Sequence, residues 1–228
     1  MSLILYIHTA TEKAWVSIAK DSRVFKSLYH ESVKDHASFL QPAIQLLLKE
    51  TSLALNEFDA IAITAGPGSY TGLRVGMASA KGLCYALQKP LILLNTLEVL
   101  AASAIYANSN TPSVGNTLFC PMIDARRMEV YYALYDSQLR VVKQPAAFIL
   151  TESSFIDLLQ HNHVFFFGNG SRKWQNICRS DNADFREIEI SPEAMAHLGE
   201  REFLKGTFAD FAHCDPIYLK EFHTFSKK

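Results

Sequence analysis

The feature that most constrains the fold is an order of strands and helices that occurs twice along the 228 residues. Alternating apolar residues and turn residues predict a β-β-β-α-β-α-β-α order, a polar stretch at Asn108–Thr117, and then the same order again. Strands that alternate with helices favour sheets covered by helices. We therefore expect an α/β fold with two halves, residues 1–107 and 108–228, and leave open whether the last segment packs back on the first half.

The boundaries of these elements follow from apolar runs and helix-capping residues. In the first half the strands are Ile4–Ile7, Ala14–Ala19, Val24–His30, Ala60–Ala65 and Leu91–Leu94, and the helices are Ser38–Glu50, Gly72–Leu87 and Leu97–Tyr106. In the second half the strands are Leu118–Ile123, Glu129–Tyr135, Arg140–Leu150, Val164–Phe167 and Phe185–Ile190, and the helices are Glu152–Gln160, Arg172–Cys178 and Pro192–Lys205. Ser191 and Pro192 suit the start of the last helix, and Gly206 is expected to end it.

The most informative local pattern is the strand, glycine loop and helix at Ile61–Leu87. The first N–H groups of a helix have no internal partner, so a loop in this position can bind a phosphate. The candidate phosphate loop consists of Gly66, Pro67, Gly68, Ser69, Thr71 and Gly72, with Arg74 as counter-charge in the first helical turn. It has neither the lysine of a P-loop nor the spacing of a dinucleotide fingerprint. A tight turn with a Ser or Thr cap explains the same residues, so both interpretations stay open.

The string G-P-G-S-Y-T-G-L-R-V-G at Gly66–Gly76 is similar to the signature of the TsaB (YeaZ) family. That family is a bacterial partner of the enzyme that installs threonylcarbamoyl on the adenosine beside the tRNA anticodon. Weaker similarities lie at Leu3–Thr11, Asp124–Tyr132 and Pro216–Leu219, so the resemblance covers nearly the full length. It implies a duplicated actin-like (ribonuclease H-like) fold, which agrees with the repeated order of strands and helices.

The resemblance also implies a function. We expect a noncatalytic scaffold subunit that binds the catalytic paralogue TsaD and supports threonylcarbamoyl transfer. The ATPase subunit TsaE and the tRNA would be reached through the complex, and the chain alone would form a homodimer. A small actin-like ATPase or kinase that uses the glycine loop for phosphate, and a metalloprotease-like protein, stay open as alternatives.

No residue is predicted to be catalytic and none to bind a metal. His8 follows the first strand at a position that is commonly acidic in the resembling family, and imidazole is a poor ligand for Mg²⁺. Asp124 lies at the matching turn of the second half, but Glu129 belongs to the next strand and nothing in the sequence brings the two together. We expect no cofactor in the isolated chain, and ATP or ADP only at the interface of the complex.

Two helices, Ser38–Glu50 and Gly72–Leu87, are predicted to form the partner surface. Their apolar faces exceed what one side of a small sheet needs. In the resembling family the equivalent helices pair with those of another subunit. The predicted contact residues are Phe39, Leu40, Ala43, Leu47, Leu73, Gly76, Met77, Ala80 and Cys84.

Composition excludes several other classes of protein. The formal net charge of −1 gives no long-range attraction for polyanions, so we expect no strong independent binding of tRNA. The four cysteines lie far apart without a C-x-x-C pair, which favours a reduced, cytoplasmic protein. The N-terminal apolar run lacks a preceding basic region, and no apolar stretch has membrane-spanning length, so we expect neither a signal peptide nor a membrane segment.

Overall fold

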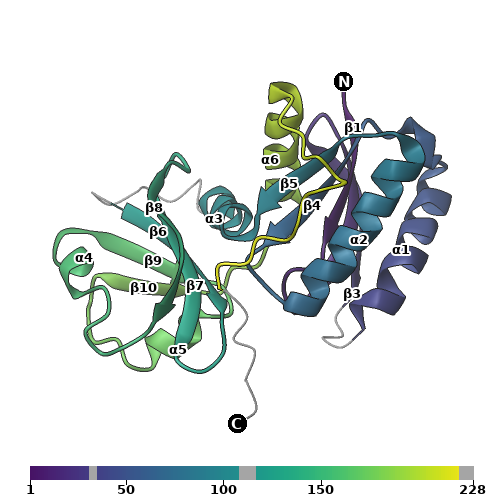
Figure 1. The fold of residues 1–228 in the computed structure, drawn as a ribbon. Coiled ribbons are helices and arrows are strands. Elements are labelled where there is room, and N and C mark those ends of the chain that lie inside the picture. The colour runs from purple at the N-terminus through teal and green to yellow at the C-terminus, as the bar shows by residue number, and fades with distance from the viewer. Residues whose placement is uncertain (31–34, 108–116, 221–228) are drawn as a thin grey trace, which may run out of the picture.

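The computed structural model describes residues 1–30, 35–107 and 117–220, and it contains two five-stranded sheets of the same topology. The strand order is β3-β2-β1-β4-β5 in the first sheet and β8-β7-β6-β9-β10 in the second, so each strand has a counterpart at the same place. In each sheet the first three strands are antiparallel and the last two run parallel to the central one. This confirms the predicted duplicated actin-like α/β fold, whose halves lie side by side in Figure 1.

The elements follow the predicted order in both halves. The first half contains β1 (Leu3–His8), β2 (Ala14–Lys20), β3 (Arg23–His30), α1 (His36–Thr51), a 3₁₀ turn (Leu55–Glu57), β4 (Ala60–Gly66), α2 (Tyr70–Leu87), β5 (Leu91–Asn95) and α3 (Thr96–Ala107). The second contains β6 (Thr117–Asp124), β7 (Glu129–Tyr135), β8 (Val141–Ile149), α4 (Ile156–His161), β9 (His163–Phe167), α5 (Ser171–Gln175), β10 (Ala183–Arg186) and α6 (Pro192–Lys205). The predicted polar stretch lies mostly outside the described residues.

Some predicted boundaries in the second half are wrong. The helix expected from Glu152 begins only at Ile156, because the Ser154 hydroxyl accepts a hydrogen bond from the Thr151 N–H and holds these residues in a turn. The strand expected to reach Ile190 ends at Arg186, since its parallel partner β9 ends at Phe167 and residues beyond have no strand to pair with.

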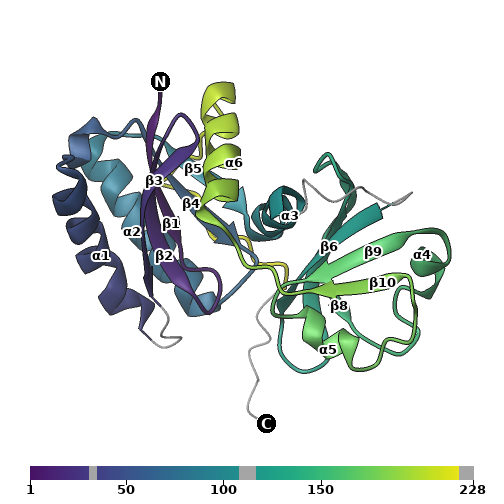
Figure 2. The same ribbon diagram turned by 180° about the vertical axis from the view of Figure 1, so that it is seen from behind.

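The helices cover the first sheet on both faces, as Figures 1 and 2 show from opposite sides. α1 and α2 pack on one face, whereas α3 and α6 pack on the other. α3 also contacts β6 and therefore lies between the two sheets. The last helix, α6, belongs by sequence to the second half but packs on β1, β3 and β5 of the first. The Tyr6 hydroxyl donates to the Ala196 carbonyl at 3.2 Å, and Gly199 lies against the Tyr6 ring.

An extended segment, residues 207–220, follows α6 and is named the C-terminal strap here. The Ala209 N–H donates to the Leu91 carbonyl at the edge strand β5, and the Ile217 N–H donates to the Ala65 carbonyl at the end of β4. Farther on, Lys220 forms an ion pair with Glu129 of β7. The strap thus runs across the first half and reaches the second, as the yellow trace in Figure 1 shows.

Candidate functional site

The glycines of the loop after β4 allow two backbones to come very close. A Cβ added at Gly68 would lie 2.2 Å from the Ala10 carbonyl oxygen, and one added at Gly72 would lie 2.0 Å from that of Thr9. One added at Gly76 would lie 2.3 Å from the Thr9 hydroxyl, which donates to the Gly72 carbonyl. The glycines of α2 therefore make room for the turn that follows β1.

The other side of the loop is covered by the C-terminal strap. Gly66 has a φ of +124°, which favours glycine, and a Cβ there would lie 2.5 Å from the Ile217 carbonyl oxygen. Pro67 is buried beside it. Thr71 is exposed at the first turn of α2 and does not take part in closing the loop.

Three of the N–H groups that a phosphate in this loop could use are already hydrogen-bonded within the chain. The Gly66 N–H donates to the Thr96 hydroxyl at 3.1 Å, and the Ser69 N–H donates to the Ala10 carbonyl at 2.7 Å. The Ser69 hydroxyl caps α2 by accepting from the Gly72 N–H. Since a bound anion would have to displace these partners, the geometry favours the capped turn over the phosphate loop.

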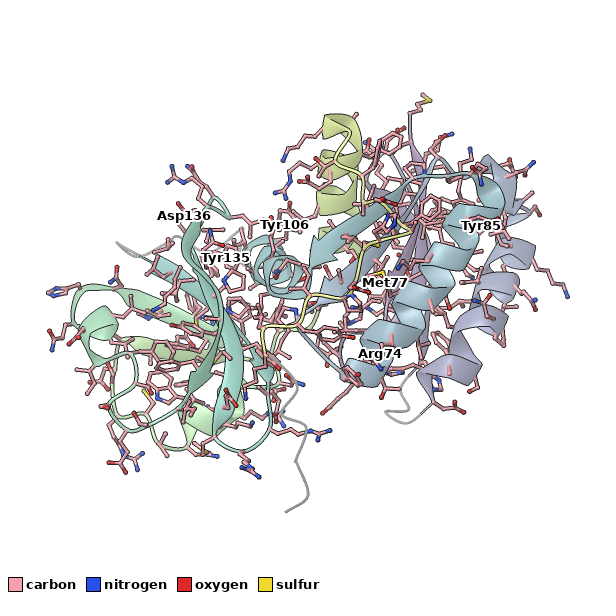
Figure 3. The ribbon with its side chains drawn as sticks, in the orientation of Figure 1. Arg74, Met77, Tyr85, Tyr106, Tyr135 and Asp136 are labelled. Atoms are coloured by element: carbon pink, nitrogen blue, oxygen red, sulfur yellow. The ribbon has the colours of Figure 1, made fainter. Side chains whose placement is uncertain are left out.

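The Arg74 side chain contacts two tyrosines. Its guanidinium carbon lies 3.9 Å from the centre of the Tyr70 ring, and its Nε donates to the Tyr218 hydroxyl at 3.2 Å. Figure 3 shows Arg74 near the start of α2, at the end of the helix where the strap passes. Arg74 thus helps to fasten the strap through a cation–π contact and a hydrogen bond.

His8 ends β1 in a fully enclosed position. Its Nδ1 lies 2.9 Å from the Thr64 hydroxyl, its Nε2 lies 2.8 Å from the Thr11 hydroxyl, and its ring lies against Trp15. Burial, with a smaller contribution from the nearby His36, lowers the pKa of His8 to about 3. The side chain is therefore a neutral hydrogen-bonding group at neutral pH and cannot supply the negative charge of a carboxylate.

The two carboxylates of the β6–β7 hairpin are each paired with a different lysine. Asp124 forms an ion pair with Lys173 and also accepts a hydrogen bond from the Arg126 N–H. The carboxylate of Glu129 is paired with Lys220 of the strap. The structure therefore does not bring Asp124 and Glu129 together as an acid–base pair.

A cavity of about 230 Å³ lies between the two halves. Its lining mixes apolar, aromatic and polar residues from both halves: His8, Thr11, Glu12, Lys13, Trp15, Tyr29, His30, Leu100, Ile123, Gly168, Asn169, Ile188, Glu189 and Ile190. Lys13 and Glu189 form an ion pair of 2.8 Å within this lining. Among the described residues, no three His, Cys, Asp or Glu side chains are grouped so that they could hold a metal ion.

Comparison with known proteins agrees with this architecture. The family model described as "TsaD: tRNA N6-adenosine threonylcarbamoyltransferase" matches residues 30–206. The protein named tRNA threonylcarbamoyladenosine biosynthesis protein TsaB from Escherichia coli is 28% identical over 95% of this chain and 94% of its own. The chain belongs to the TsaB (YeaZ) family. The TsaB of Haemophilus influenzae is also 28% identical, over 98% of this chain and 96% of its own.

Solved structures of the TsaB (YeaZ) family have the same fold. YeaZ from Pseudomonas aeruginosa superposes with a TM-score of 0.76 at 27% identity, covering 96% of this chain and 100% of that one. A second structure, described as an uncharacterized protein with similarity to peptidase YEAZ from the same organism, has a TM-score of 0.78 at 25% identity and the same coverage. Within the described residues, no helix is long and apolar enough to cross a lipid bilayer.

The residues predicted for the partner surface lie on the inner faces of α1 and α2. All except the half-buried Phe39 are buried in the chain's own core: Leu40, Ala43, Leu47, Leu73, Gly76, Met77, Ala80 and Cys84. The prediction that these side chains are available to a partner is therefore wrong for the single chain. The apolar stripe packs instead on the first sheet and, at Met77, beside Cys214 of the strap. Figure 3 shows Met77 between α2 and the strap.

The outer face of the same two helices carries a different set of residues. Leu46 of α1 is 46% exposed and Tyr85 of α2 is 71% exposed. On its exposed side α2 also presents small side chains at Ala78 and Gly82, and a Cβ added at Gly82 would meet nothing within 4 Å. We name Leu46, Ala78, Gly82 and Tyr85 the outer helix face. Helical spacing could have revealed it, because Ala78, Gly82 and Tyr85 follow one another at steps of four and three.

Proposed function

We propose that this chain is a noncatalytic subunit of the machinery for tRNA threonylcarbamoyladenosine biosynthesis, which binds the catalytic paralogue TsaD. Family membership supports this proposal, as do the names of the relatives from E. coli and H. influenzae. The observation that carries the noncatalytic part is the state of the two strand ends that face each other in an actin-like fold. His8 is neutral at one of them, and Asp124 is paired with Lys173 at the other.

Neither strand end therefore offers an unpaired carboxylate. This matters because Mg²⁺ bound to a nucleotide requires oxygen ligands, usually carboxylates. A neutral imidazole with both nitrogens beside hydroxyl groups offers no such ligand. The carboxylate of Asp124 would have to leave its lysine first. We therefore place any ATP or ADP at the interface with the catalytic paralogue, and we assign the chemistry to that paralogue. Contact with TsaE and tRNA would come through the complex, and a cytoplasmic location stays a prediction.

The outer helix face is the surface that we assign to the partner. Leu46 and Tyr85 supply exposed apolar area, and Ala78 with Gly82 lets another helix approach closely. Gln41 donates to the Ser79 hydroxyl and ties the two helices into one platform. In the absence of TsaD, a second copy would use the same face, because a two-fold contact employs one surface twice.

A charge on this face tests the proposal. Gly82→Arg should abolish co-purification with tagged TsaD from the same organism, because an arginine would stand in the path of the approaching helix. Circular dichroism should be unchanged, since the site is open in the single chain. Leu204→Arg is the matched control, as Leu204 is an exposed apolar residue on α6. Normal assembly of the Gly82→Arg variant with TsaD would rule out this surface.

The function itself is tested by reconstitution. The chain with TsaD and the remaining subunits should form threonylcarbamoyladenosine on tRNA, and omission of the chain should abolish that activity. The chain alone should show no ATP turnover above a His8→Asn variant. Turnover by the purified chain that depends on His8 would instead support the alternative of a small actin-like ATPase.

A further inference from the structure

The turn between β6 and β7 holds two consecutive arginines in an unusual backbone conformation. Arg126 has a φ of +69° and Arg127 a φ of +51°, the left-handed region that glycine and asparagine occupy most easily. The Asp124 carboxylate accepts from the Arg126 N–H, and the Glu129 N–H donates to the Arg126 carbonyl. The backbone here would accept Asn-Gly with less strain, so the arginine side chains are not needed to form the turn.

The charges around this turn do not balance. Asp124 and Glu129 are the carboxylates next to it, and each is already paired with a lysine, Lys173 and Lys220 respectively. Arg126 and Arg127 are both exposed, and neither guanidinium has a hydrogen bond or ion pair with another described residue. Two positive charges therefore remain uncompensated on one strained hairpin, although the chain as a whole has a net charge of −1.

We propose that this arginine turn binds backbone phosphates of the RNA on which the complex acts. The inference rests on the proposed function, which supplies the RNA. A guanidinium presents a planar fork of N–H donors that matches a phosphate, and two neighbouring forks can contact successive phosphates. Contacts of this kind position an RNA without reading its bases. Two phosphate contacts are too few for binding by the chain alone, so the turn acts only when the partner subunit holds the rest of the RNA.

The position of the turn suits this role. At the start of the turn, the Asp124 N–H donates a hydrogen bond to the side-chain oxygen of Asn169. Asn169 lines the cavity between the halves. Lys220 at its end belongs to the strap, which also crosses the first half beside the start of α2. The backbone of the turn is thus held by a hydrogen bond to Asn169 and by the ion pair between Glu129 and Lys220 of the strap, while the two arginine side chains stay exposed.

The test uses the complex of this chain with TsaD and its tRNA. In the variant R126N/R127G the left-handed conformation is easier to adopt, so the melting temperature should be equal or higher. The affinity for tRNA should nevertheless fall by on the order of tenfold at 0.15 M salt, and the slope of log K against log salt should become shallower by about 1.5, because two phosphate contacts are lost. The matched control is K20N/R23N, which removes two exposed cations beside the β2–β3 turn, where Asp21 and Ser22 also have positive φ.

The outcomes separate this inference from the proposed function. Failure of the wild-type chain to assemble with TsaD would count against the proposed function. If the wild-type and R126N/R127G complexes both form and bind tRNA with equal affinity and equal salt slope, the arginine turn does not contact RNA. If R126N/R127G loses TsaD while K20N/R23N keeps it, the turn binds an acidic surface of the protein partner, which overturns the RNA assignment.

Discussion

The two halves share one sheet topology but differ in the helices that cover it. α1 and α2 of the first half have 16 and 18 residues, whereas α4 and α5 at the equivalent places have 6 and 5. A helix of one or two turns covers the sheet beneath it and presents little else. A helix of 16 residues is about 24 Å long and can bury one side while it keeps an extended outer face. The two halves therefore have the same sheet topology, but only the first half has helices long enough to present an exposed helical surface.

The loop glycines Gly66 and Gly168 are equally tight, with an added Cβ 2.5 and 2.4 Å from a carbonyl oxygen, but the glycines at the starts of α2 and α5 differ. At Gly72 an added Cβ would lie 2.0 Å from the Thr9 carbonyl oxygen, whereas at Gly170 the nearest atom, the carbonyl carbon of Ile123, would be 2.9 Å away. In both halves glycine lets the helix after the fourth strand come close to the end of the first strand. The long helix of the first half is seated more tightly than its short counterpart.

The largest expected effect comes from a charge on the inner face of α2. Met77→Glu should destabilise the chain by about 4 kcal/mol or more, because the carboxylate would be buried without a partner. Circular dichroism and urea unfolding measure it. Ala78→Glu, one residue along on the exposed side, should stay folded. A stably folded Met77→Glu monomer would show that this face of α2 is not part of the core and would break the comparison of the two faces.

A smaller loss of stability is expected when alanine replaces the glycines that lie against another part of the backbone. Gly72→Ala should cost about 1–3 kcal/mol, because backbone atoms on both sides must move. Gly170→Ala should cost less, since its nearest contacts are longer and include the Val130 side chain. Gly82→Ala is the control and should stabilise the chain by about 0.5–1 kcal/mol through better helix propensity. Equal losses at Gly72 and Gly170 in urea unfolding would remove the difference in tightness between the halves.

The last expected effect depends on pH and concerns His8 at the end of β1. The pKa of His8 is about 3 in the folded chain and about 6.5 when unfolded, so its stabilising contribution is complete above pH 6.5 and declines as the pH falls toward 3. Between pH 7 and pH 5 this loss should reach about 2 kcal/mol. Urea unfolding of wild type and of His8→Asn at both pH values isolates this loss of stability, because asparagine at position 8 does not titrate. The same pH dependence in both proteins would mean that the His8 ring becomes protonated without unfolding.

The sequence predicted the repeated order of elements because each strand and helix carries its own apolar period and its own caps. Ser69 and Ser191 cap the helices they precede, and Gly206 ends α6. Prediction failed where a boundary depends on a distant partner. Arg186 ends β10 because β9 ends beside it, and no residue near Arg186 encodes where β9 stops.

The candidate site was harder to predict than the fold. A glycine loop before a helix has the same letters whether it binds a phosphate or admits another backbone, and only the positions of Thr9, Ala10 and Ile217 distinguish the two. The apolar stripe of α1 and α2 likewise marks a packing face without saying what covers it, so the inner face was assigned to a partner. The exposed Tyr85 and the open Gly82 were missed, because their helical spacing marks one side of α2 but does not say that this side faces solvent.

By itself the sequence determined the family, the duplicated α/β fold and the absence of a P-loop lysine, since these depend on local patterns and on the Gly66–Gly76 string. The tertiary structure decided which face of α2 is free, what fills the glycine loop, which lysine neutralises Asp124, and that α6 packs on the first sheet. Each of those depends on atoms that are far apart in the chain and meet only when the two halves and the strap have folded together.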